Sequence, residues 1–198
     1  MKFLTACVLL LSVLLAQGQV TNVETLVCIR HGEKPAGGLG QLTCQGLNRA
    51  LALPKVLLAR YGKPDYVFAP NPVQKVDRGG TYNYIRPLMT IEPTAVQCGL
   101  PVNTEYGYKE IEALQEELQQ PKYKSSVVFV AWEHVWLDKF AKALLTCDGG
   151  DAQQVKEWPS DDYDTIYVFK ITHVGGHSYA TLTIEKEGLN GLPSDCPK

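Results

Sequence analysis

The sequence predicts an α/β protein, a three-layer α/β/α sandwich with a mostly parallel central sheet. Short runs rich in β-branched and aromatic residues alternate along the chain with longer amphipathic stretches, which is the pattern of repeated strand–helix units. Two of the short runs, residues 24–29 and 126–131, are largely apolar, as is typical of strands that are buried on both faces of a sheet. Helices that cover both faces of such a sheet complete the three layers.

In the first half of the chain, the strand over residues 24–29 is followed by a predicted helix over residues 43–60. Thr43 can cap this helix, and its apolar residues recur at helical spacing. Pro54 predicts a kink or an early end within it. The next strand is expected over residues 66–69. Residues 70–80 contain two prolines and a Gly-Gly pair, which predicts a loop.

In the second half, helices are predicted over residues 86–98, 108–119 and 135–146. Gly99 ends the first of them. The strand over residues 126–131 precedes the third helix. Two further strands, residues 165–172 and 178–185, are joined through Gly175-Gly176 as a hairpin. The tail from Gly188 is rich in turn residues and is expected on the surface.

The first eighteen residues have the features of an export signal. Lys2 supplies a positive start, residues 3–16 are almost unbroken apolar sequence, and Ala16-Gln17-Gly18 offers small residues for cleavage. The apolar run is short for a membrane span, although an uncleaved anchor is the alternative. The prediction is therefore a signal peptide over residues 1–18 and a single domain over residues 19–198. The mature protein would be extracellular, or periplasmic in a bacterium.

Charge and cysteine content narrow the possible partners. The chain has 19 Lys and Arg against 21 Asp and Glu; without Lys2 this becomes 18 against 21, a net charge of −3. This balance favours neither nucleic acid nor an anionic membrane as a partner. Export favours one or two disulfides, and because the number of mature cysteines is odd, at least one thiol should be free or paired between chains. No spacing suggests zinc. The mature cysteines, whose pairing stays open, are Cys28, Cys44, Cys98, Cys147 and Cys196.

Charged residues follow two of the predicted strands at the point where each ends. Arg30, His31 and Glu33 follow the first strand, and Glu133-His134 follows the strand that ends at residue 131. Ligands bind beyond the carboxyl ends of strands in sheets of this kind, so the two histidines are expected to meet. Guanidinium can hold phosphate oxygens with paired hydrogen bonds, and a neutral imidazole can attack phosphorus. The pattern therefore indicates phosphate chemistry.

Residues 26–35, LVCIRHGEKP, resemble the opening motif of the histidine phosphatase superfamily, the phosphoglycerate-mutase-like proteins. Three further segments resemble that family in the same order: residues 42–50, residues 86–103 and the strand ending in Trp132-Glu133-His134. The stretch WPSDDYDTIY, residues 158–167, resembles a subgroup with the Trp-Glu-His form. The resemblance covers residues 24–172 and implies the phosphoglycerate-mutase-like fold.

The resemblance also implies roles for four residues. His31 would be the nucleophile that is transiently phosphorylated, and Arg30 and Arg86 would bind the phosphate oxygens. His134 would donate a hydrogen bond to the transferred group. Two arginines and a histidine can replace a metal ion in stabilising charge, so no metal and no other cofactor are expected.

Two departures from the family pattern concern the same site. A Ser-Pro pair is often found after the second strand, whereas this chain has Ala69-Pro70-Asn71; Asn71 could offer an alternative hydrogen bond to substrate. The general acid is also open, with Glu105 as the candidate and Glu133 as its rival. Without an acid, substrates with leaving groups of low pKa would still react.

The sequence thus predicts a secreted, metal-independent phosphatase that hydrolyses esters of a small phosphorylated substrate through a phosphohistidine on His31. The alternative is a catalytically weak or inactive protein that binds phosphate ligands on the same fold. A phosphomutase ranks below both, because the connection from Arg86 to Ser126 leaves little room for an enclosing lid. The physiological substrate and the oligomeric state stay open.

Overall fold

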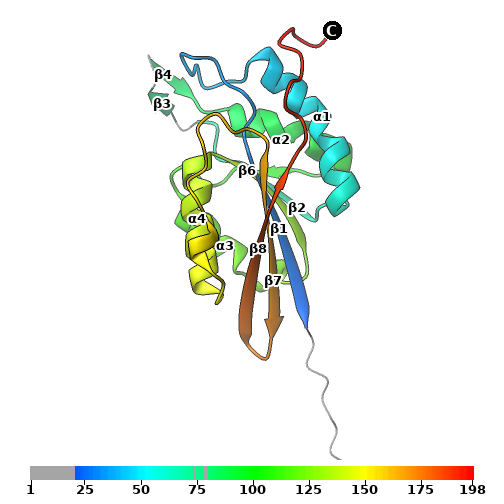
Figure 1. Ribbon diagram of the computed structural model, residues 1–198, viewed down its shortest axis with the longest axis vertical. Helices are drawn as coiled ribbons and strands as arrows, with labels where there is room; N and C mark the ends of the chain where they lie inside the picture. Colours follow the sequence, from blue (N-terminus) through cyan, green and yellow to red (C-terminus); the bar gives the residue numbers. More distant parts are fainter. Residues whose placement is uncertain (1–20, 74, 78–79) are drawn as a thin grey trace, which may run out of the picture.

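Within residues 21–73, 75–77 and 80–198, which the computed structural model describes, six strands form one sheet in the order β5-β2-β6-β1-β7-β8 (Figure 1). The predicted export signal lies outside the described residues. The strands are β1 (Asn22–Arg30), β2 (Tyr66–Phe68), β5 (Val102–Asn103), β6 (Val127–Trp132), β7 (Thr165–Val174) and β8 (His177–Lys186). Strands β5, β2, β6 and β1 run parallel, β7 pairs antiparallel with β1, and β8 pairs antiparallel with β7. The predicted mostly parallel sheet is confirmed.

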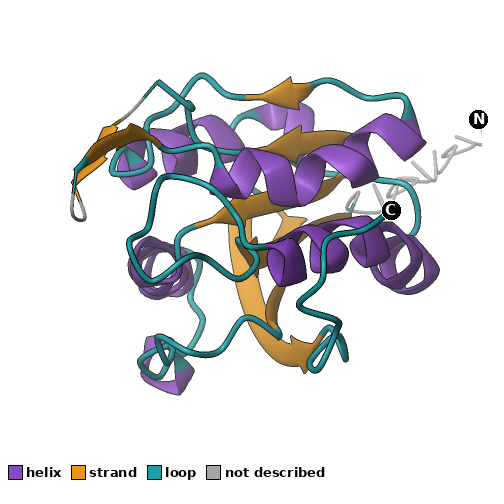
Figure 2. Cartoon of the chain, turned by 90° about the horizontal axis from the view of Figure 1, so that it is seen from above, coloured by secondary structure: helices purple, strands orange, loops and turns teal. Residues whose placement is uncertain are grey.

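Helices cover both faces of this sheet. They are α1 (Cys44–Tyr61), α2 (Arg86–Cys98), α3 (Ile111–Leu118) and α4 (His134–Cys147), with 3₁₀ turns at Pro121–Tyr123 and Ala152–Gln154. Leu53 and Leu57 of α1 and Ile91 of α2 pack on one face, in a core that includes sheet residues such as Val27. Helices α3 and α4 pack on the other face, in a second core. Seen from above, the strands are flanked by helices, so the predicted three layers are confirmed (Figure 2).

The local predictions differ from the structure in three places. Residues 70–80 were expected to be a loop, but β3 (Lys75–Asp77) pairs with β4 (Thr81–Asn83) in a separate small hairpin. Pro54 does not end its helix, because α1 continues to Tyr61 and packs one face on the sheet. The two-residue strand β5 was missed, since so short a run has no periodicity to detect.

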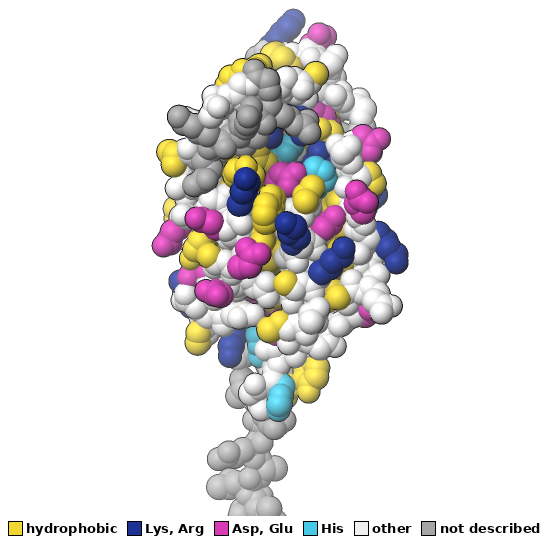
Figure 3. All heavy atoms as spheres, turned by 90° about the vertical axis from the view of Figure 1, so that its left-hand side faces the viewer, with side chains coloured by type: hydrophobic (Ala, Val, Ile, Leu, Met, Phe, Trp, Pro, Cys, Tyr) yellow, Lys and Arg dark blue, Asp and Glu magenta, His cyan; other side chains and the backbone are white. Residues whose placement is uncertain are grey.

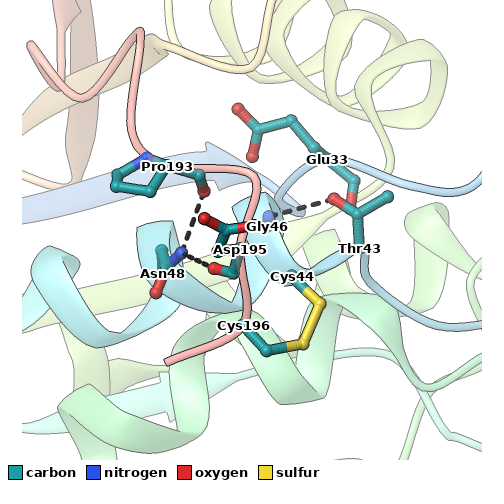
Figure 4. The surroundings of a disulfide bond; sticks show 8 residues. All are labelled: Glu33, Thr43, Cys44, Gly46, Asn48, Pro193, Asp195 and Cys196. Atoms are coloured by element: carbon teal, nitrogen blue, oxygen red, sulfur yellow. Dashed lines mark hydrogen bonds between the residues drawn. A yellow bond between two sulfur atoms is a disulfide. The ribbon is translucent and has the colours of Figure 1, made fainter. Parts of the chain in front are cut away.

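The C-terminal tail lies against α1 and is tied to it by a disulfide. Cys196 is bonded to Cys44, the first residue of α1 (Figure 4). Asn48 of α1 donates hydrogen bonds to the carbonyls of Pro193 and Asp195 at 2.9 and 2.8 Å (Figure 4). Cys28 and Cys98 are free and buried, and Cys147 is free and exposed. In the described part of the chain, no helix has the length and apolar character that a membrane crossing requires.

Candidate active site

The two histidine motifs meet because β1 and β6 are neighbours in the sheet. The two strands are parallel and in register, with Arg30 opposite Trp132, and the His31 amide donates to the Trp132 carbonyl at 3.0 Å. His134 begins α4 two residues after β6 ends. In the surface view of Figure 3, two histidine side chains lie beside an acidic side chain in the upper part of the molecule. The sheet thus brings together residues that are about a hundred positions apart.

His31 is held as a neutral imidazole with one free nitrogen. Its side chain is fully buried, and Nδ1 lies 2.7 Å from the carbonyl oxygen of Gly32. Because that oxygen can only accept, Nδ1 carries the proton and Nε2 keeps its lone pair. Burial, followed by the charge of Arg86, lowers the pKa of His31 well below its ordinary value. Nε2 has no hydrogen-bond partner in the structure. This is the state that a nucleophilic imidazole requires.

Two buried guanidiniums flank this imidazole. Arg30 donates from Nη1 to the Asp162 carbonyl at 2.8 Å, while its Nε and Nη2 have no partner. Arg86 donates from Nη1 to the Gly38 carbonyl at 3.1 Å, and its Nε has no partner. Burial lowers the pKa of Arg30, but guanidinium stays charged at neutral pH. Buried donors without acceptors are costly, so this set of N–H groups fits an anion.

Two tyrosines that sequence reasoning did not single out form walls of the site. The Arg30 guanidinium carbon lies 4.0 Å from the centre of the Tyr163 ring, and that of Arg86 lies 4.6 Å from the Tyr84 ring. The centres of the Tyr163 and Tyr84 rings lie 6.0 and 6.1 Å from the centre of the His31 ring. Tyr163 falls in the segment 158–167 that resembles the family, which was the available signal; Tyr84 had none.

His134 lies at the start of α4, and its neighbour Glu133 caps that helix. The Glu133 carboxylate accepts from the amides of Val135 and Trp136 at 3.1 and 3.4 Å, and His134 Nδ1 is 2.7 Å from Glu133 Oε1. Burial raises the pKa of Glu133, but the adjacent His134 imidazole outweighs burial and the pKa is lowered. Glu133 is therefore ionised, caps α4 and is a poor proton donor.

No hydrogen bond or ion pair among the described residues links Asn71 or Glu105 to this cluster. The Asn71 side chain accepts from the Val73 amide at 3.0 Å, so it stabilises its own turn. Glu105 is exposed, and among the described residues no hydrogen bond or ion pair joins its carboxylate to His31, Arg30, Arg86 or His134. Both residues follow strands of the same sheet edge, yet their side chains serve other contacts or face solvent.

The loop that holds His31 is supported by residues whose role the sequence did not reveal. The Thr90 hydroxyl accepts from the Gly32 amide at 2.9 Å and donates to the Arg86 carbonyl at 2.8 Å. It thereby links the loop that holds His31 to Arg86.

Gly46 and Arg49 of α1 support the same loop from behind. A Cβ added at Gly46 would overlap the backbone oxygen of Glu33, so only glycine allows this approach. The fully buried Arg49 binds the Glu33 carboxylate from Nε and Nη2, at 3.1 and 2.7 Å, and also reaches Glu187. Arg49 therefore anchors Glu33, and with it the loop that holds His31, to α1.

Beside His134 the surface is hollowed. The hollow, of about 580 Å³, lies between the first turns of α4 and the segment 157–160; its lining includes His134, Lys139, Lys142, Glu157 and Ser160. In residues 21–73 and 80–198 no group of three or more His, Cys, Asp or Glu side chains is arranged to hold a metal ion.

Comparisons with known proteins identify the fold. No family model and no curated protein match the sequence. Among solved structures, a mycobacterial glucosyl-3-phosphoglycerate phosphatase superposes with a TM-score of 0.56 at 14% identity, over 82% of this chain and 98% of that one. A phosphoserine phosphatase from Entamoeba histolytica gives 0.52 at 12% identity, over 84% and 98%. A phosphoglycerate mutase from Plasmodium falciparum gives 0.54 at 13%, over 89% and 98%. The chain thus has the fold of these phosphatases and mutases.

Proposed function

We propose that this chain, which has the phosphoglycerate-mutase-like fold, is a metal-independent phosphatase of the histidine phosphatase superfamily. The observation that supports it is the neutral, buried His31, with Nε2 free, beside two guanidiniums that keep unpartnered N–H groups. The Trp-Glu-His subgroup is part of the same proposal.

The reaction proceeds in two displacements. The Nε2 lone pair of His31 attacks phosphorus, an N–P bond forms, the P–O ester bond breaks, and the departing oxygen takes a proton from solvent. Water then attacks the phosphohistidine, the N–P bond breaks, and phosphate and neutral His31 are released. Arg30 and Arg86 donate to the equatorial oxygens, and His134 donates to the transferred group, so the charge is stabilised by fixed donors.

The general acid is not assigned. Glu133 is occupied at the cap of α4, and Glu105 is exposed. Leaving groups that depart without protonation, such as aryl or acyl oxygens, are therefore the favoured substrates.

The test is phosphate release from an aryl phosphate in the presence of a chelator, comparing the native protein with His31→Ala. His177→Ala is the matched control, because this exposed histidine lies on the β7–β8 hairpin. Loss of the nucleophile should reduce kcat/KM by about 10³-fold or more, whereas the control should match the native protein. Equal rates for His31→Ala and the native protein would contradict the proposal.

A second candidate is a protein that binds phosphate ligands with little or no turnover. The observation in its favour is that the site is closed to solvent. The Tyr163 ring lies against Arg30, and Nε2 of His31 is buried. Trapping with a radiolabelled phosphodonor separates the two candidates. An acid-labile adduct that His31→Ala abolishes supports the enzyme; saturable phosphate binding without an adduct supports the second candidate.

We also propose that the chain is exported. The apolar run over residues 3–16 supports this, and the Cys44–Cys196 disulfide is stable in an oxidising compartment. Expression of the full chain in a secreting host should give a product that begins after residue 18, as determined by N-terminal sequencing. A product that keeps residue 1 and stays with the cells would contradict export.

A further inference from the structure

A second cavity lies at the end of the sheet where β1 begins, whereas His31 follows the end of β1. It has a volume of about 240 Å³ and is formed where β1 begins, where β7 turns into β8, and where α3 and α4 end. Figure 3 shows two further histidine side chains at this lower end, well apart from the upper pair. The residues that line it, and that the argument uses, are Glu24, Leu118, Lys124, Cys147, Asp148 and His173.

Glu24 is the unusual member of this cavity. Its side chain is 2% exposed, and Oε1 has no hydrogen-bond partner. Oε2 lies 3.4 Å from His173 Nε2, and His173 Nδ1 lies 2.9 Å from the Ser178 hydroxyl. A buried carboxylate oxygen without a donor is costly, so a water molecule, an ion or another bound group is expected to partner it.

The charges around Glu24 also favour a cation as the missing partner. Asp148 is the second carboxylate of the cavity, and its burial raises its pKa. Burial and Asp148 together raise the pKa of Glu24 to about 8, while Lys124 acts in the opposite direction. Burial and Lys124 lower the pKa of His173. No ion pair among the described residues joins Lys124 to Glu24, so this lysine leaves Oε1 without a partner.

The remaining lining is mostly aliphatic. It consists of Leu26, Leu118, Leu144 and Ile171, with Gln119 and Ser178 as its polar members. A pocket of this size suits a molecule smaller than a typical drug, with a polar head and a short apolar body.

We infer that this cavity binds a small organic ammonium ion, whose N–H groups donate to Glu24 Oε1 and to Asp148 and whose apolar body packs on the leucines. With Glu24 ionised, the two carboxylates and Lys124 leave one negative charge, which the ligand neutralises. The site is separate from His31 and does not depend on the proposed phosphatase activity.

The test is calorimetric titration of the purified protein with n-butylammonium, with n-butanol and butyrate as matched probes. Saturable binding of the ammonium alone, in the millimolar range expected for so small a ligand, is the predicted result. Glu24→Gln keeps the shape and removes the charge, and it should weaken binding at least tenfold. Glu112→Gln, an exposed carboxylate on α3, is the control and should bind as the native protein does. His31→Ala should also bind normally.

The pH dependence adds a second readout. Because the ammonium binds ionised Glu24, its binding below pH 8 expels a proton, and affinity should rise by about tenfold for each pH unit. Cys147 reports the location, since the ligand should slow alkylation of this exposed thiol. Absence of saturable binding, or equal binding by Glu24→Gln in protein that circular dichroism shows to be folded, would overturn the inference and indicate that water alone fills the cavity.

Discussion

At the residue scale, the charge state of His31 connects its burial to both stability and chemistry. The unfolded imidazole takes up a proton near pH 6.5, whereas burial and Arg86 keep the folded one neutral to a lower pH. The unfolded state therefore binds more protons between these two values. The stability due to neutral His31 is complete above about pH 7 and is lost as the pH falls through this window.

Urea unfolding of the native protein and of His31→Gln, from pH 5 to pH 7.5, measures this effect. The difference in unfolding free energy between the two should rise by up to about 1.4 kcal/mol per pH unit below pH 6.5 and then become constant. His177→Gln should give no such difference. A difference that is constant over the whole range would show that His31 is not held neutral by the fold.

Thr90 and Thr94 offer a matched pair on one helix. Both side chains are buried in α2, but Thr90 bonds the Gly32 amide, while the Thr94 hydroxyl has no partner. Thr90→Val leaves the Gly32 amide unpaired and should cost about 1–3 kcal/mol of stability. It should also reduce kcat/KM about tenfold, because Gly32 adjoins His31, the proposed nucleophile. Thr94→Val should be neutral or stabilising. Similar losses in the two variants, by denaturation and kinetics, would refute the role given to Thr90.

At the scale of elements, the site depends on how closely α1 approaches the loop after β1. The amide of Thr43 donates to the Glu33 carbonyl at 2.9 Å, and Gly46 lies against the same residue. The helix start that Thr43 caps therefore also fixes the loop that holds His31. This explains why the sequence combines a cap, a glycine and Arg49 at these spacings.

Gly46→Ala tests this contact between elements. The added methyl group overlaps the Glu33 backbone, so the loop must shift, with an expected loss of about 1–3 kcal/mol and about 10²-fold in activity. Gly37→Ala is the control, because its nearest neighbour is 4.0 Å away and the residue is exposed. Thermal unfolding and kcat/KM measure both. Normal activity in Gly46→Ala would mean that the loop does not need this close packing.

At the scale of the whole molecule, the disulfide joins the first helix to the end of the chain. Cys44 and Cys196 are 152 positions apart, so the bond restricts a large part of the unfolded chain. Cys196→Ser should lower the free energy of unfolding by about 2–4 kcal/mol. Cys147→Ser removes an exposed free thiol and should leave stability unchanged. Guanidinium unfolding curves that coincide for native protein and Cys196→Ser would contradict a stabilising role.

The sequence by itself determined most of the secondary elements and the strand ends that carry the candidate site. Apolar runs and helical periodicity are local signals. A strand or helix that buries one face shows its pattern of apolar residues within a short stretch of sequence. They predicted the strands that precede His31 and His134, the helix that begins with Arg86, and the hairpin at Gly175-Gly176. The short β3–β4 hairpin escaped, since three-residue strands give too few positions for a pattern.

Only the tertiary structure decided which groups meet. The parallel pairing of β1 with β6 places His31 beside the start of α4, and packing of α2 against the loop gives Thr90 its role. Glu133 could have faced the site, but the orphan amides of α4 bind it instead. Long-range packing also decides which cysteine pairs with Cys196, and it leaves Oε1 of Glu24 without a hydrogen-bond donor. These contacts depend on the register and distance of segments far apart in sequence, which no local pattern encodes.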